Sequence, residues 1–375
     1  MNNNDSVWRS GEKAAFGLRA LYQSYGYSQY KMSKFEEYDL YVRNKDFLDS
    51  DHIITFTDTN GKLMALKPDV TLSIIRNSKD TPGSVQKLYY NENVYRVSKG
   101  TQSFREIMQT GLECIGDIDD YCLFEVLRLA AESLRLISES YVLDLSHLGV
   151  VSGILDSLNL SSEDRNAVLK CIGGKNFHEI SEICAKAGID TSQVELLKLL
   201  VSTYGTPEEV LPRLQALRID ESTGEAIGQL CRIVQTLQAS GCGDRIRIDF
   251  SVINDMKYYN GFVFKGFIDG IPSGILSGGQ YDKLMSKMGK KAGAIGFAVY
   301  LDQLERIFEN SPAYDVDAVL LYDSSSDLQT IHDTAQFLGE GGKSVLVQRL
   351  IPENLTYKQL LRLREGRVEI LENNA

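Results

Sequence analysis

The stretch at residues 85–116 constrains the fold of this chain more than any other part. It contains two runs rich in β-forming residues, 85–96 and 104–116, joined by a short polar loop, and this pattern predicts a long β-hairpin. Because side chains alternate between the faces of a strand, Gln109 and Glu113 are expected on one face, with a glycine between them. An amide and a carboxyl group placed in this way indicate the floor of a polar pocket, whereas a solvated strand face is the simpler alternative.

The composition is that of an ordinary soluble globular protein. With 375 residues, 43% of them hydrophobic, the chain is long enough for a large core and two or three domains. The formal net charge of −11 disfavours attraction to a phosphate backbone, so we expect no nucleic-acid partner. No stretch has the apolar length of a secretion signal or of a membrane span, and we expect a cytoplasmic protein with no membrane association.

The cysteines and histidines point away from metal and covalent chemistry. The six cysteines form no C-x-x-C pair, and the four histidines belong to no H-E-x-x-H or Ser-His-Asp grouping. Buried free thiols are the simplest interpretation of the cysteines. The sequence therefore predicts no metal site, no cofactor and no catalytic residue for metal-assisted hydrolysis or acyl transfer.

The first 150 residues have an α+β pattern. Apolar spacing predicts helices at about 11–25 and 121–139. Between them, an Asn-Gly hairpin signal at Asn60 precedes a short helix at 69–76, for which Asp69 is a good cap. Strands joined by hairpins indicate an antiparallel sheet with helices packed against it.

A helical insertion interrupts this pattern at about 152–240, where Ser161 and Pro207 are typical of helix starts. Strands of the earlier type resume at Ile246. After Pro312 the chain alternates strand, helix, strand, helix and strand, with TYKQLLRLREG expected as the second of these helices.

These patterns predict one large domain at 1–311, which includes the insertion, and a small C-terminal α/β domain at 312–375.

Segments in four parts of the chain resemble a known family. They are LMALKPDVTLSIIR, VYRVSKGTQSFREIMQTGLECIG, MKYYNGFVF, and SGGQYDKL followed by GAIGFAVYLDQL. In this order they resemble the class II aminoacyl-tRNA synthetases, specifically the histidyl-tRNA synthetase family, over about residues 5–310. The resemblance implies the class II fold, an antiparallel sheet flanked by helices, and a truncated anticodon-binding-like domain at the C-terminus.

The resemblance also implies a histidine-binding pocket. Its residues would be Asp69, Thr71, Gln109, Glu113, Tyr258, Tyr259 and Tyr281, with Arg96 at the position of a phosphate-contacting arginine. The set is chemically coherent, because a carboxylate accepts from an imidazole N–H, and Asp69 and Gln109 offer acceptors to an α-amino group. The alternative is that the tyrosines only pack a sheet, and it fits Tyr258, which strand alternation would turn away from Tyr259.

The chain departs from the pattern of an active synthetase at three motif positions. Gln303 occupies the place of the third-motif arginine, Asn254 that of an arginine before the tyrosine pair, and Ser33 that of the first-motif proline. Fixed cations stabilise the charge that develops when an adenylate forms, and one such donor contributes about 10²–10³-fold in rate. We therefore expect no aminoacylation and a vestigial Arg96.

A chain that keeps the histidine pocket but lacks the residues for ATP and tRNA binding resembles the regulatory subunits of ATP phosphoribosyltransferase. The resemblance implies a non-enzymatic subunit that binds histidine and partners the short-form catalytic transferase in the first step of histidine biosynthesis and its feedback control. It further implies a homodimer within a hetero-oligomer, with residues 27–41 at the homodimer contact. A divergent histidyl-tRNA synthetase, or a scaffold with an unused pocket, are the alternatives.

Overall fold

The computed structural model describes most of the chain. The described residues are 10–48, 53–97, 103–253, 256, 258–305, 314–351 and 353–374. They divide into two compact units, one at Lys13–Leu304 and a smaller one that contains Glu305–Ala375. The domain limits 1–311 and 312–375 stay predictions, and the polar hairpin loop and Asn254 lie outside the described residues.

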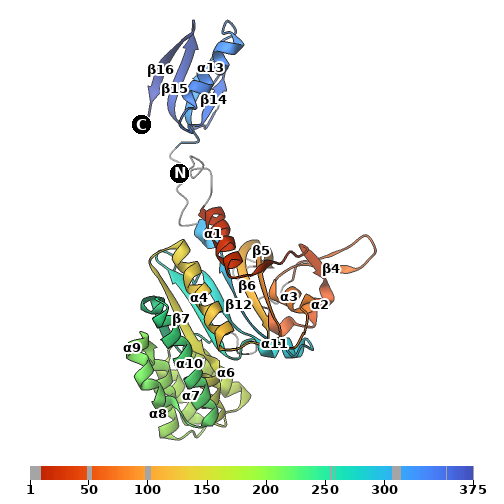
Figure 1. Cartoon of the computed structure of the whole chain (residues 1–375), viewed down its shortest axis with the longest axis vertical. Coiled ribbons are helices and arrows are strands. Elements are labelled where there is room, and N and C mark those ends of the chain that lie inside the picture. Colours follow the sequence, from red (N-terminus) through yellow and green to blue (C-terminus); the bar gives the residue numbers. More distant parts are fainter. Residues whose placement is uncertain are drawn as a thin grey trace. The chain divides into compact units, whose positions relative to one another are not determined.

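A nine-stranded sheet organises the large unit (Figure 1). From edge to edge its strands are β1 (Ser28–Gln29), β5 (Val85–Val97), β6 (Phe104–Gly116), β12 (Gly293–Tyr300), β11 (Leu276–Gln280), β10 (Phe262–Ile268), β7 (Tyr141–His147), β9 (Ile246–Asp249) and β8 (Tyr204–Gly205). The predicted hairpin is confirmed, because β5 and β6 pair antiparallel along their whole length. The sheet is not purely antiparallel, however, since β1 pairs parallel with β5 and β7 with β9.

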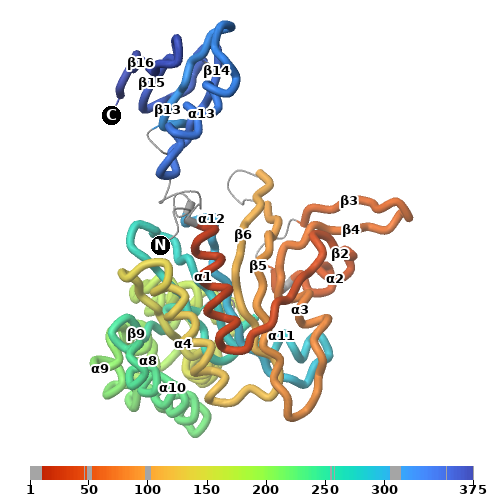
Figure 2. The backbone as a smooth tube through the Cα atoms, turned by 45° about the horizontal axis from the view of Figure 1, so that its top comes forward, coloured from red at the N-terminus to blue at the C-terminus, as the bar shows by residue number. Residues whose placement is uncertain are grey.

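Two helices, α1 (Ser10–Ser24) and α4 (Asp120–Ile137), cover one face of this sheet (Figures 1 and 2). The helix α4 begins where Asp119 accepts a hydrogen bond from the Cys122 amide (2.9 Å), which satisfies one of the free donors of the first turn. Its apolar stripe is fully buried, and it packs with the apolar face of β6 in the main hydrophobic core. The opposite face of the sheet carries a second core cluster, which includes Tyr90, Val94 and Ile115, together with the buried polar side chains of Gln109 and Glu113.

A small three-stranded sheet and a short helix lie over that opposite face. The strands are β2 (Phe35–Glu37), β4 (Leu63–Leu66) and β3 (Thr55–Thr57), and β2 leads into α2 (Tyr38–Val42). After β4 the chain runs through residues 67–70 into α3 (Thr71–Asn77), close to the predicted helix. Figure 2 shows β3 and β4 extending from the body of the unit.

The helical insertion consists of α5 (Leu148–Asp156), α6 (Ser162–Gly173), α7 (Phe177–Lys186), α8 (Thr191–Ser202), α9 (Pro207–Val210) and α10 (Glu221–Ala239). It begins a few residues earlier than predicted, because the helix starts directly after β7 with His147 as its cap. The predicted starts are confirmed: Ser161 accepts from the Asp164 amide, and Pro207 occupies the first turn of α9. Two short elements, α11 (Asp282–Lys287) and α12 (Asp302–Glu305), follow β11 and β12.

The smaller unit has a four-stranded sheet in the order β14 (Val345–Gln348), β13 (Val316–Leu321), β15 (Tyr357–Arg364) and β16 (Arg367–Asn373), with the helix α13 (Leu328–Leu338). The helix predicted for TYKQLLRLREG is wrong, because this segment is the strand β15. Its Leu and Arg residues favour a helix intrinsically, but Leu361 and Leu363 alternate with exposed arginines and are buried in the core. A turn at Glu365-Gly366 with positive φ then joins β15 to β16.

Candidate functional site

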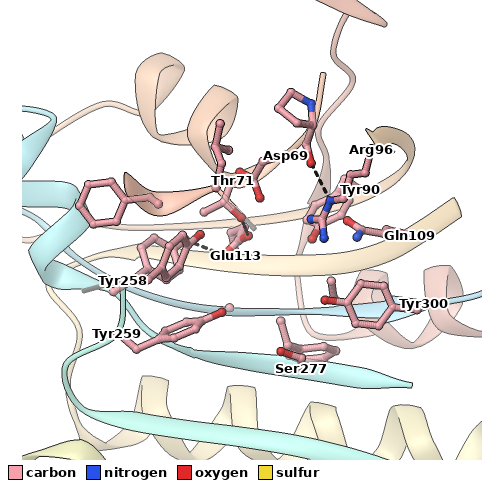
Figure 3. Close-up of a pocket in the computed structure, with 17 residues that line it drawn as sticks. Asp69, Thr71, Tyr90, Arg96, Gln109, Glu113, Tyr258, Tyr259, Ser277 and Tyr300 are labelled. Atoms are coloured by element: carbon pink, nitrogen blue, oxygen red, sulfur yellow. Dashed lines mark hydrogen bonds between the residues drawn. The ribbon is translucent and has the colours of Figure 1, made fainter. Parts of the chain in front are cut away.

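One cavity of about 240 Å³ opens on the face of the large sheet opposite α1 and α4. All of the residues predicted for the site line it, namely Asp69, Thr71, Arg96, Gln109, Glu113, Tyr258, Tyr259 and Tyr281. Figure 3 shows how the labelled ones converge from several elements. The wall also includes residues that were not predicted for the site, although Pro68, Ser277 and the residues of β12 lie within the segments quoted above: Phe47, Leu48, Pro68, Tyr90, Ser277, Gly296, Phe297, Ala298 and Tyr300.

Glu113 lies at the bottom of the cavity and is only 2% exposed. Its two carboxyl oxygens accept hydrogen bonds from two hydroxyl groups, Thr71 Oγ1 at 2.9 Å and Tyr281 OH at 2.5 Å. Burial raises the pKa of the Glu113 carboxyl to about 8, with a small further increase from Asp69, although the two hydrogen bonds act to lower it. A buried carboxyl group with this pKa is poised to gain or lose a proton near neutral pH.

Gly296 explains how the Glu113 carboxyl fits against the sheet. The two residues are direct partners in the antiparallel pair of β12 and β6. A Cβ atom at Gly296 would lie 1.8 Å from Glu113 Oε2, so any side chain there would displace the carboxyl group.

Asp69 and Thr71 enter the cavity from the segment at residues 67–71, which we call the strap. The strap leads from β4 into α3, and Asp69 Oδ1 accepts from the Leu72 amide (2.9 Å) in the first turn of that helix. Its backbone is tied to the hairpin, because the Tyr95 amide donates to the Lys67 carbonyl (2.9 Å). The predicted cap at Asp69 is one residue early, because Val70 is the N-cap residue of α3. The proline at position 68 and the bond between Asp69 and the Leu72 amide nevertheless restrict how the two side chains enter the cavity.

Arg96 and Gln109 lie at the other end of the cavity from Tyr258 (Figure 3). Arg96 Nε donates to the Pro68 carbonyl (3.0 Å), so this guanidinium group helps to hold the strap. Gln109 is 4% exposed. Among the described residues that line the cavity, Arg96 is the only Lys or Arg. The vestigial phosphate role of Arg96 stays a prediction.

Three tyrosines form the remaining wall. The rings of Tyr258 and Tyr259 are 4.5 Å apart, and Tyr281 lies 5.8 Å from Tyr258. The alternative that Tyr258 faces away from Tyr259 is wrong: β10 begins only at Phe262, so strand alternation does not apply to this pair. Burial raises the pKa of Tyr258 and Tyr281 well above 10, and both phenols therefore remain neutral donors.

The substituted motif positions lie away from the cavity where they are described. Gln303 is not part of the cavity wall, and its Oε1 accepts from Ser273 Oγ (2.8 Å). Ser33 Oγ accepts from the Phe35 amide (3.3 Å).

The described part of the chain contains no group of three or more His, Cys, Asp or Glu residues arranged to hold a metal ion. None of its helices has the length and apolar character needed to cross a membrane.

Comparison with known proteins identifies the family of this chain. Residues 5–304 match the family model described as histidyl-tRNA synthetase, which confirms the predicted class II fold. Within that class, the ATP phosphoribosyltransferase regulatory subunit of Caldanaerobacter subterraneus is 32% identical over 293 residues, which cover 76% of each chain. The regulatory subunit of Oceanobacillus iheyensis is 29% identical over 290 residues, 76% of this chain and 71% of the relative. The chain belongs to the family of ATP phosphoribosyltransferase regulatory subunits.

Solved structures support the fold. A structure from Bacillus halodurans, described as an ATP phosphoribosyltransferase regulatory subunit/histidyl-tRNA synthetase, superposes with a TM-score of 0.78 at 22% identity and covers 96% of both chains. A chain of the ATP phosphoribosyl transferase (HisG:HisZ) complex of Thermotoga maritima has a TM-score of 0.60 at 19% identity, over 76% of this chain and 96% of that one. At these identities the likeness concerns the fold.

Proposed function

We propose that this regulatory subunit binds free histidine in the cavity and conveys its concentration to a catalytic transferase. The observation that carries the proposal is the buried Glu113, held by Thr71 and Tyr281 at the bottom of a cavity of amino-acid size. A carboxyl group in this position accepts from an imidazole N–H, and the tyrosine rings offer apolar contact to the flat ring.

The other end of the cavity suits the α-amino and carboxyl groups of the ligand. Asp69 and Gln109 are acceptors for an ammonium group, and Arg96 supplies a cation next to them. The cavity volume of about 240 Å³ is below the ~300–1,000 Å³ typical of sites for drug-sized ligands. A single amino acid therefore matches the site better than a nucleotide.

The replacement of the third-motif arginine by Gln303 favours the sensing of histidine over its activation as an adenylate. Adenylate formation requires fixed positive charge around the phosphates, and Gln303 stands at the third-motif position with its amide bonded to Ser273. Histidine would act by binding one arrangement of the complex more tightly than another. The names of the relatives support a transferase complex as the setting in which this chain acts. We propose further that the partner is a short-form catalytic subunit and that this chain is a homodimer within a cytoplasmic hetero-oligomer.

Calorimetric titration of histidine into the complex with the catalytic subunit tests the proposal. Glu113→Gln keeps the shape of the side chain but removes its ability to become an anion, and we expect histidine affinity to fall about 10-fold or more. The control is Glu106→Gln, a change on the exposed part of β6, which should leave the affinity unchanged. A wild-type complex that shows no heat of histidine binding would contradict the proposal.

A divergent histidyl-tRNA synthetase is the second candidate, favoured by the family model over residues 5–304. Histidine-dependent exchange between ATP and pyrophosphate separates the two functions. We expect no exchange above background, and robust exchange would establish the enzyme. Co-purification of a short transferase subunit with this chain would support the regulatory role directly.

A further inference from the structure

Lys67 is a buried charge that the proposed function does not use. Its side chain is 0% exposed, and it does not line the cavity. A buried ammonium group is costly unless it is paired. Here Nζ lies 2.5 Å from Glu92 Oε2, whose side chain is 17% exposed. Replacing such a pair by apolar groups is often neutral for stability, so a buried lysine at this position calls for another explanation.

The ion pair connects two walls of the cavity. Lys67 is the first residue of the strap and stands two positions before Asp69. Glu92 is on β5, directly opposite Gln109 on β6, so the two side chains share one face of the sheet. The pair therefore ties the segment that carries Asp69 to the strand position beside Gln109.

The Glu113 end of the cavity has its own supports. Thr71 opens α3, and this helix is anchored through Ser73 and Arg76, which bind Glu36 Oε1 at 2.7 and 2.9 Å. Tyr281 holds Glu113 from the start of α11. Loss of the Lys67–Glu92 pair should therefore disturb Asp69 more than Glu113.

We propose that Lys67, through its ion pair with Glu92, is a positioning residue that sets Asp69 against Gln109 and so makes the site selective for ligands with an α-ammonium group. The inference rests on the proposed histidine site and deepens it. An ammonium group needs acceptors that converge on its N–H directions, and a shift of about 1 Å in one of them is enough to lose the bond.

The test compares histidine with imidazolepropionate, which lacks the α-amino group, by ligand-observed NMR titration of the full chain. Lys67→Met keeps the length and the apolar stem of the side chain. We expect histidine affinity to fall about tenfold, while that of imidazolepropionate changes less than about twofold. Glu92→Gln keeps an acceptor for the ammonium group and should change selectivity in the same direction, to a smaller extent.

A double-mutant cycle that combines Lys67→Met with Asp69→Asn tests whether Lys67 acts through Asp69. If Lys67 acts through Asp69, Lys67→Met should not lower histidine affinity further in the Asp69→Asn background. Lys62→Met is the matched control, because it breaks the Lys62–Glu37 pair (2.9 Å) at the small three-stranded sheet, where both side chains are more than half exposed.

Equal weakening of both ligands by Lys67→Met, or unchanged selectivity, would overturn the inference and leave the histidine site standing. If Lys67→Met does not fold, the selectivity of Glu92→Gln for histidine over imidazolepropionate tests the inference in its place. A wild-type chain that binds no histidine would overturn the proposed function and this inference together.

Discussion

Glu113 combines two properties that are in tension at the scale of a single residue. It is buried and lies near Asp69, which favours its neutral form, yet it accepts two hydroxyl hydrogen bonds, which favour its anion. Burial has the larger effect on the pKa, so the carboxyl group is mostly protonated at neutral pH in the absence of a ligand. An imidazolium ring bound to Glu113 would stabilise the anion in the same place.

This balance predicts a pH-dependent stability. The pKa of Glu113 is raised from 4.5 to about 8 in the folded chain, so the folded state binds the proton more tightly than the unfolded state. The free energy of unfolding should therefore be highest below pH 4.5 as far as this group is concerned, and should fall as the pH rises toward 8, by an amount on the order of 4 kcal/mol.

Thermal melts of the large unit between pH 5 and 9 measure this effect. We expect the melting temperature of the wild type to decline relative to that of Glu113→Gln, which has no proton to lose. Saturating histidine should reduce the decline. Parallel curves for the two proteins would show that Glu113 titrates at its ordinary pKa.

The residues of the site could be predicted from the sequence mainly because they lie in motifs. Alternation on a strand placed Gln109 and Glu113 on one face, and the resemblance supplied the tyrosines and Asp69. Lys67 was not accessible, because a lysine before a proline carries no sign of burial until its partner on β5 is known. The pKa of Glu113 depends on tertiary burial and was equally out of reach.

At the scale of elements, the contact between β12 and β6 decides the shape of the cavity. Glu113 and Gly296 face each other, and the absence of a side chain at Gly296 leaves the space that the carboxyl group occupies. The glycine is needed for this close approach and not for an unusual backbone angle.

Gly296→Ala should therefore abolish or strongly weaken histidine binding, by at least about 10-fold, and should also strain the pairing of β12 with β6, because the added Cβ would lie 2.5 Å from the Leu112 carbonyl oxygen. The added methyl group must push Glu113 away from Thr71 or Tyr281. Gly228→Ala on α10 is the control, since its added Cβ has Arg232 Nη1 as its nearest neighbour, at 3.5 Å. Calorimetry that finds wild-type affinity in Gly296→Ala would refute this account of the site.

The strand β15 shows where element prediction fails. Its composition favours a helix, and only pairing with β13 and β16 turns it into a strand. The other elements near the site, including β5, β6, α3 and α4, follow from local patterns because their periodicity and caps agree with the tertiary fold.

At the scale of the whole molecule, the cavity belongs entirely to the unit Lys13–Leu304. The class II architecture and the place of the helical insertion could be predicted from the order of the motifs. The parallel pairing of β1 with β5 and of β9 with β7 could not be predicted, since β1 and β9 are short and their partners are remote in sequence.

This division predicts that the small unit can be unfolded without loss of the ligand site. Leu363 is buried in the core of the small unit, and Leu363→Asp would place an unpaired charge there at a cost of several kcal/mol. We expect proteolysis of the small unit in this variant, with histidine affinity of the large unit unchanged. Ile370→Asp, on the exposed neighbouring strand, is the control. A loss of histidine binding in Leu363→Asp would show that the two units depend on each other.

The alternation of β6 has a consequence for how this family diverges. Gln109 and Glu113 reach the ligand cavity from one face of this strand, while Leu112 on the other face packs in the core beneath α1 and α4. A single inserted or deleted residue here would turn the cavity-facing side chains toward the core and the core-facing ones toward the cavity, and would disrupt both surfaces. Relatives can drift far by substitution, but the spacing along this strand is expected to stay fixed for as long as the cavity is under selection.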